Sequence, residues 1–275
     1  MRCHNRTDKS TACLRLSDGS SWGITAGDAK AVSIVDSLAE AMQLRPSGNI
    51  SHRLLIRVRE SPAELVTPVQ REGGVECILG PSLTRDVAAA QMQLLSQVMA
   101  LYAQDSGGVL LHGALAEKDG KGVLLAGRGE AGKTTASGRL TLPWRSLCDD
   151  TALVVRDGEG SYRAHPWPTW STFMFGGQGG TWDIQRSVPL KGIFLLEQAP
   201  DERAEPTGQG EAVCLLSECA EQVTLPVLHS LTPEEARGFR VQRFDNISDL
   251  TRAVPVFTLR LSLTGRFWKE IERVL

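Results

Sequence analysis

No apolar run in the 275-residue sequence reaches the roughly 18 residues of a membrane-spanning helix, so we expect no membrane partner. The first residues, 1–6, are polar and lack the apolar core of a signal peptide. The six cysteines form no CxxC pair and match no common zinc template, which favours reduced thiols. A net charge of −2 argues against a uniformly basic surface, so nucleic acid is not an expected partner. Together these absences predict a cytoplasmic protein.

What remains is the composition of an ordinary globular protein, with 41% hydrophobic and 23% charged residues. A chain of this length can form one large domain or two modest ones. Residues 1–80 have a mixed α+β pattern: Asp28 and the apolar spacing predict a helix over 28–44, and alternation predicts a strand over 52–59. We expect this smaller N-terminal region to bind a partner or peptide, and residues 81–275 to form an α/β domain.

The expected α/β domain alternates apolar strands with helices. Pro81 and Ser82 are expected to open a helix that reaches about Ala103. Asp119 and Gly120 separate two apolar runs, which is typical of a hairpin. The remaining predicted elements are strands over 109–116, 122–126, 152–155, 192–197 and 254–263, a loop over 199–210, and helices over 133–140, 211–222, from Thr232 and over 266–275.

The most informative segment matches the phosphate-loop pattern G-x-x-x-x-G-K-S/T in full. An apolar strand leads into it, and a plausible helix follows. In such a loop the glycines let backbone N–H groups point at phosphates, the lysine supplies a point charge, and the following hydroxyl serves Mg²⁺. The alternative is a glycine-rich turn with a surface lysine. The residues expected to bind a nucleotide are Gly127, Arg128, Gly129, Glu130, Ala131, Gly132, Lys133, Thr134 and Thr135.

The adjacent Asp149 and Asp150 supply the carboxylates that a magnesium-bound triphosphate requires. They precede the apolar run 152–155, where two neighbouring carboxylates are costly to bury without a cation. One of the two aspartates can bind Mg²⁺ together with the Thr134 hydroxyl, and the other can accept the proton of an attacking hydroxyl. A surface Asp-Asp turn is the alternative. His112, in the strand over 109–116, is either an interior hydrogen-bonded histidine or a partner of one of these aspartates.

These motifs together resemble HPr kinase/phosphorylase, whose P-loop core is of the phosphoenolpyruvate-carboxykinase type. In that family a histidine-glycine strand precedes the loop, and a double aspartate follows the Walker serine or threonine by 15 and 16 positions. Thr134, Asp149 and Asp150 reproduce this spacing. The resemblance implies an ATP-dependent kinase in which Asp150 activates the acceptor and His112 orients or charge-balances it. It also implies that Lys133 steadies the phosphoryl group and that Asp149 and Thr134 bind Mg²⁺. It also implies homo-oligomerisation, since HPr kinases form hexamers.

A closer likeness is to the ScmC proteins of the SynChlorMet cassette, over about residues 82–275. The segments that carry it are 165–170, 176–183, 188–190 and 255–260. Those genes lie beside radical-SAM maturases and a short precursor peptide. This resemblance implies that the phosphoryl acceptor is a serine or threonine of a small ribosomal peptide or carrier protein, with the maturases as further partners.

Two features leave alternatives open. The glutamate-rich metal signature of HPr kinases has no clear counterpart, and the corresponding region contains Gln178 instead. A catalytically weak nucleotide-binding switch is therefore one alternative, and a nucleotidyltransferase another. The aromatic residues interspersed with glycines are either core packing or a lid or docking surface for a peptide. They are Trp167, Trp170, Phe173, Phe175 and Trp182.

Overall fold

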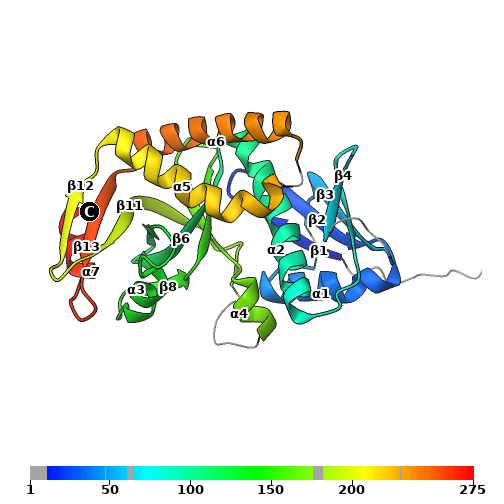
Figure 1. The fold of residues 1–275 in the computed structure, drawn as a ribbon, viewed down its shortest axis with the longest axis horizontal. Helices are drawn as coiled ribbons and strands as arrows, with labels where there is room; N and C mark the ends of the chain where they lie inside the picture. Colours follow the sequence, from blue (N-terminus) through cyan, green and yellow to red (C-terminus); the bar gives the residue numbers. More distant parts are fainter. Residues whose placement is uncertain (1–10, 47, 61–64, 176–181, 230) are drawn as a thin grey trace, which may run out of the picture.

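Two mixed β-sheets, accompanied by seven α-helices, organise the part of the chain that the computed structural model describes, namely residues 11–46, 48–60, 65–175, 182–229 and 231–275. The smaller sheet and α1 lie at one end of the molecule, and the C-terminal strands lie at the other (Figure 1). The described residues contain no helix long and apolar enough to cross a membrane.

The smaller sheet has five strands in the order β1-β2-β3-β5-β4. Its strands are β1 (Thr11–Arg15), β2 (Ser21–Ala26), β3 (His52–Val58), β4 (Val66–Arg71) and β5 (Gly74–Leu79). A short 3-10 helix (Ala29–Ala31) and α1 (Val32–Ala41) connect the parallel strands β2 and β3. Asp28 caps this connection by accepting from the N–H of Ala31 at 3.0 Å. The α-helix is shorter than the predicted 28–44, because the chain turns at Gln43 with a φ of 48°.

Helix α2 (Arg85–Tyr102) packs its apolar face into the core shared with the smaller sheet. The prediction that Pro81 and Ser82 open this helix was wrong. Thr84 is the N-cap, and its hydroxyl accepts from the N–H of Val87 at 3.2 Å. A threonine cap supplies a partner for a helix N–H that would otherwise be unpaired, so the helix begins at the following residue.

The larger sheet has eight strands, of which seven run in the order β10-β9-β6-β7-β11-β13-β12 while β8 pairs with β6. A short pairing of β10 with β11 links distant members of this order. The strands β7, β11 and β13 are mutually parallel, and most of their residues are buried, as expected for strands covered on both faces. The strands are β6 (Val109–Lys118), β7 (Lys121–Ala126), β8 (Arg145–Cys148), β9 (Thr151–Arg156), β10 (Tyr162–Trp167), β11 (Val188–Gln198), β12 (Arg203–Pro206) and β13 (Val256–Leu261).

The predicted hairpin between β6 and β7 is confirmed. Asp119 and Gly120 have φ values of 52° and 74°, so both central residues adopt the left-handed conformation of a type I′ turn. This turn matches the twist of the two antiparallel strands. The turn therefore sets the register between β6 and β7. Strand β7 ends at Ala126, directly before the glycine-rich loop.

The loop predicted over 199–210 instead contains the edge strand β12, and α5 begins before its end. Edge strands tolerate polar residues and proline, so β12 gave no apolar pattern to find. Thr232 and Glu235 form a reciprocal capping box at the start of α6, at the predicted position. The remaining helices are α3 (Lys133–Arg139), α4 (Trp170–Phe175), α5 (Gln209–Leu228), α6 (Pro233–Ala253) and α7 (Trp268–Val274).

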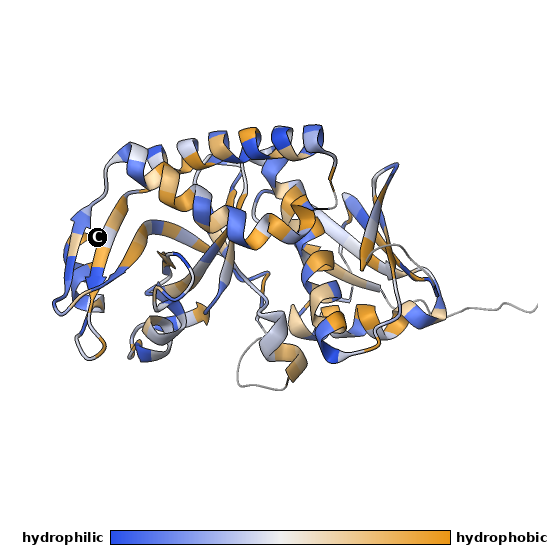
Figure 2. Ribbon diagram, viewed as in Figure 1, coloured by the Kyte–Doolittle hydropathy of each residue, from blue (hydrophilic) through white to orange (hydrophobic). Residues whose placement is uncertain are grey.

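Helices α5 and α6 lie side by side along the larger sheet (Figure 1). In Figure 2, β11 is mostly coloured as hydrophobic whereas α6 carries much hydrophilic surface. Leu216 of α5 and Ile247 and Leu250 of α6 are fully buried in the core of this sheet. The two helices thus bury one apolar stripe each and leave the other side to solvent.

His165 ties the two sheets together. It is 1% exposed, and its Nε2 accepts from the N–H of Ser17 in the β1–β2 turn at 3.1 Å. Its Nδ1–H donates to the carbonyl of Ile184 at 2.6 Å, which fixes the neutral tautomer. Burial lowers the pKa of His165 to about 4, although the Ile184 carbonyl opposes this shift. The imidazole is therefore neutral in the folded protein at neutral pH.

This buried histidine predicts acid destabilisation. Since the folded pKa lies below the unfolded value, the unfolded chain binds the proton more strongly, so stability falls as the pH drops from about 6.5 to about 4. The expected loss is on the order of 3 kcal/mol, measured by urea unfolding monitored with tryptophan fluorescence. A His165→Gln variant should lose this pH-dependent component. An identical stability–pH curve for both proteins would contradict the assignment.

Candidate functional site

The glycine-rich loop connects β7 to α3 through a tight turn. A Cβ on Gly127 would lie 2.8 Å from the Cβ of Ala131, and Gly132 has a φ of 95° that favours glycine. Glu130 also adopts a left-handed φ of 64°. The side-chain amide of Gln198, at the end of β11, donates to the Glu130 carbonyl at 2.8 Å and supports this conformation. The loop shape is thus set by glycines within it and by a neighbouring parallel strand.

Lys133 turns back into the loop. Its Nζ donates to the carbonyls of Gly127 and Arg128, both at 2.9 Å, and the residue is only 6% exposed. Burial lowers the pKa of Lys133, while the charges of Cys219 and Asp150 oppose that shift. These two carbonyls hold the amine at the centre of the loop.

A cavity of about 720 Å³ opens in front of the loop. Glu130, Ala131, Gly132, Lys133, Thr134 and Thr135 line it together with His112 and Asp150. The other three predicted loop residues do not line this cavity: Gly127, Arg128 and Gly129 line an adjoining cavity of about 340 Å³, which Glu130 and Ala131 line as well. Arg128 there forms a two-pronged ion pair with Glu218, at 2.6 and 3.0 Å. The hydroxyl-bearing Thr134 and Thr135 are exposed toward the first cavity.

Several residues that line the front cavity were not predicted. Among them, Leu261 ends β13, and Arg139 donates to the carbonyl of Ser262 at 2.6 Å. The ends of β7, β11 and β13 meet at one edge because the three strands are parallel. Ligands of open α/β sheets bind at such carboxyl ends. A parallel order of strands distant in sequence leaves no local pattern, so these residues had no signal in the sequence. The unpredicted lining residues are Arg139, Gln198, Ala199, Pro200, Leu261, Ser262 and Leu263.

Asp150 and His112 come together on the wall of the cavity. The His112 Nε2 lies 3.2 Å from the Asp150 Oδ1, and the His112 Nδ1 lies 2.7 Å from the Oε1 of Gln222 on α5. Thr151 donates its hydroxyl to the other Asp150 oxygen at 3.1 Å. Of the two interpretations of His112, the structure therefore shows the contact with an aspartate. Gln222 was not predicted, since no sequence pattern connects it with residue 112.

The electrostatics around Asp150 favour its ionised form. Burial alone would raise the pKa of Asp150, but the hydrogen bond and charge of His112, the Thr151 hydrogen bond and the Lys133 charge outweigh it. The net result is a pKa below the ordinary aspartate value. Asp150 is thus a carboxylate at neutral pH, held opposite a lysine across the same cavity.

Asp149 occupies a different position. Its Oδ1 accepts from the Thr169 hydroxyl at 2.9 Å, and it is absent from the residues that line the front cavity. Within the described ranges, no group of three or more His, Cys, Asp or Glu side chains is arranged to hold a metal ion. Magnesium sites often use one or two carboxylates with phosphates and waters, and the oxygen-bearing side chains that line the front cavity include Glu130, Thr134 and Asp150. A role for Asp149 in binding magnesium stays a prediction.

The aromatic residues after β9 divide into two groups. Trp167 and Trp170 are 2% and 4% exposed and belong to the shared core, so for them the core-packing interpretation is confirmed. Phe175, at the end of α4, is 51% exposed. Residues 176–181, including Gln178, lie outside the described part of the chain.

The fold and this site define a mixed α/β protein in which a strand–loop–helix segment, rich in glycine, shares a cavity with a histidine-paired carboxylate. The family model described as SynChlorMet cassette protein ScmC matches residues 75–275. Since this match covers most of the chain, the protein belongs to the ScmC family. No curated protein matches the chain.

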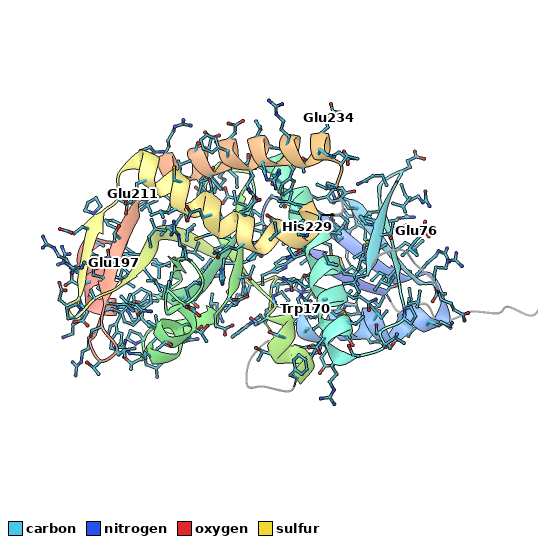
Figure 3. All side chains as sticks on the ribbon, in the orientation of Figure 1. Glu76, Trp170, Glu197, Glu211, His229 and Glu234 are labelled. Carbon is cyan, nitrogen blue, oxygen red and sulfur yellow. The ribbon has the colours of Figure 1, made fainter. Side chains whose placement is uncertain are left out.

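Removing the His112 ring is expected to raise the pKa of Asp150. In a His112→Ala variant the carboxylate loses a hydrogen bond and a nearby charge, while the burial that raises its pKa is reduced only slightly. The measurement is a carboxyl-carbon NMR titration of Asp150. His229→Ala, an exposed histidine at the far end of α5 (Figure 3), is the matched control and should leave the titration unchanged. An unshifted Asp150 in His112→Ala would contradict the pairing.

Proposed function

We propose that this protein is an ATP-dependent kinase that transfers the γ-phosphoryl group to a serine or threonine hydroxyl of a small ribosomal peptide or carrier protein. One observation carries the proposal. The ionised Asp150 and the lysine of the phosphate-loop motif line a single cavity. A kinase needs a cation at the phosphates and a carboxylate near the acceptor hydroxyl, and this cavity offers both.

The loop amides and Lys133 would bind the β- and γ-phosphates. For this, the Lys133 amine exchanges its contacts with the Gly127 and Arg128 carbonyls for phosphate oxygens. Thr134 and Asp149 would hold Mg²⁺. When bound, this ion neutralises charge on the phosphates. The oxygen chemistry of these side chains suits a hard divalent cation.

Asp150 would accept the proton of the acceptor hydroxyl, and His112 would hold the carboxylate in position. Gln222 in turn orients the histidine through its other ring nitrogen. The low pKa makes Asp150 a weak base. In phosphoryl transfer this is no obstacle, because the transition state is largely dissociative and positioning with charge stabilisation supplies most of the acceleration.

The family supports the proposed acceptor class. ScmC proteins are named for a cassette, and the resemblance stated above places the genes of that cassette beside radical-SAM maturases and a precursor peptide. A kinase in this setting would act on a hydroxyl of that peptide or of a carrier protein. The resemblance to HPr kinases supports the same chemistry and a homo-oligomeric assembly.

One observation favours a second candidate, a nucleotide-binding switch with weak catalysis. The Asp149 carboxylate is engaged by Thr169, and within the described ranges no three-residue acidic or histidine group is preassembled for metal. Nucleotide would then change the affinity for a peptide or maturase without phosphoryl transfer. Nucleotidyl transfer is a third candidate, which differs in the mass of the product adduct.

The kinase proposal predicts separable effects of two substitutions. Lys133→Ala should abolish ATP binding, whereas Asp150→Asn should retain ATP binding and slow transfer to the precursor peptide by on the order of 10²- to 10⁴-fold. Labelled ATP, the peptide and mass spectrometry measure both effects. Asp249→Asn, an exposed aspartate on α6, is the control and should behave like the unmodified protein.

Three outcomes separate the candidates. Full transfer by Asp150→Asn, combined with none by Lys133→Ala, would show that Asp150 is not the base. Tight ATP binding by the unmodified protein with no transfer would favour the switch. A peptide adduct heavier than one phosphate would identify nucleotidyl transfer.

A further inference from the structure

A second, smaller groove of about 250 Å³ lies between α2 and α4. Trp170, labelled in Figure 3, lies at the start of α4 beside α2. Among the described residues, Asp150 is the single one that lines both this groove and the cavity in front of the glycine-rich loop. The Asp150 carboxylate therefore lies between two cavities. Lys133 lines the cavity in front of the glycine-rich loop but does not line the groove.

Two residues that line the groove each contain a buried hydrogen-bonding atom without a partner among the described residues. Gln97 is 2% exposed; its amide nitrogen donates to the Val223 carbonyl, but its Oε1 has no partner among the described residues. The indole Nε1 of the equally buried Trp167 also lacks one. Both residues line the groove. Both atoms are closed to solvent, so an occupant of the groove does not contact them, and its recognition depends on the walls and the charge of the groove.

The walls of the groove combine small and aromatic side chains with polar ones such as Gln93 and Ser171. Ala89 and Ala90 of α2 form one side, Trp170 belongs to the other, and Phe175 leaves half of its surface exposed at the end of α4. Aromatic surface next to small side chains suits an apolar side chain of an extended segment. The exposed Phe175 gives the groove an anchoring point that the core does not need.

The charge of the groove is acidic. Its charged lining residues are Asp86, in the first turn of α2, and Asp150, and no lysine, arginine or histidine lines it within the described ranges. An acidic groove repels a triphosphate and attracts a basic segment, whereas the loop cavity holds Lys133. We therefore expect the nucleotide and the occupant of the groove to bind on different sides of Asp150.

We propose that this groove binds an extended, neutral or basic peptide segment and presents its serine or threonine hydroxyl to Asp150. The inference rests on the proposed kinase function for the chemistry, but the peptide site is defined by the groove itself. Phosphoryl transfer would break the bond between the γ-phosphorus and its bridging oxygen and form a bond to the peptide oxygen. The hydroxyl proton passes to Asp150, and ADP leaves.

The first test reverses a charge. Asp86→Lys should weaken binding of a short lysine-flanked serine peptide by roughly fivefold and improve binding of a glutamate-flanked one. Glu234→Lys is the matched control, because Glu234 is also acidic in a first helical turn and lies on α6, away from α4 (Figure 3). Both variants lose the same favourable interaction with a helix N-terminus. A difference between their peptide affinities therefore reflects the charge in the groove. Fluorescence anisotropy of labelled peptides measures the affinities.

The second test removes the aromatic anchor. Phe175→Ser should weaken binding of the same lysine-flanked peptide roughly tenfold. Phe244→Ser on α6 is the control, since both phenylalanines are 51% exposed. Neither change should alter ATP affinity measured by calorimetry, because neither residue lines the loop cavities.

The outcomes distinguish the groove from the kinase. Loss of peptide binding in Asp86→Lys and Phe175→Ser, but not in the two controls, supports the peptide site. Failure of all the serine peptides to bind, or equal binding by Phe175→Ser and Phe244→Ser, overturns it. Peptide binding that depends on the groove but gives no transfer from ATP contradicts the kinase proposal and leaves the peptide site standing.

Discussion

Strand β6 is the constraint on which the site depends. It pairs with β7 along one edge and with β9 and β8 along the other. One edge therefore determines where the glycine-rich loop begins, and the other determines where Asp150 lies. Gly113 sits at this junction: its N–H donates to the Asp150 carbonyl at 2.8 Å, and a Cβ there would lie 2.9 Å from a Leu124 methyl. A larger residue would push apart the two strands that bring loop and carboxylate together.

Lys133 and Asp150 also interact electrostatically within the site. Lys133 is buried enough for its pKa to fall, yet it stays beside the carboxylate whose pKa falls as well. Each group stabilises the charge of the other, and His112 adds a partner that Gln222 holds in place. Such mutually supporting perturbations are common at functional sites, although structural ion pairs produce them too. Here both residues with shifted pKa values line the same cavity.

The N-terminal sheet is not a separate unit in its packing. One hydrophobic core contains Ile24 and Leu54 of that sheet, Leu95 of α2, and Leu153 and Trp167 of the larger sheet. Helix α2 therefore contacts the smaller sheet on one side and borders the groove between α2 and α4 on another. A partner that binds the first 80 residues would act on the site through this helix. The division of the chain at residue 80 stays a prediction, because the two parts share this core.

The sequence by itself determined the local features. The Asp119-Gly120 turn, the Thr232 capping box and the glycine-rich loop all depend on residues close together in the chain, so their patterns could be read directly. Only the tertiary structure decided which carboxylate faces the loop, because Asp149 and Asp150 point to different neighbours although they are adjacent. The same holds for Gln222, for the end of β13 and for the groove beside α4. These depend on strand order and helix packing between segments more than 60 residues apart, for which a single sequence carries no periodic signal.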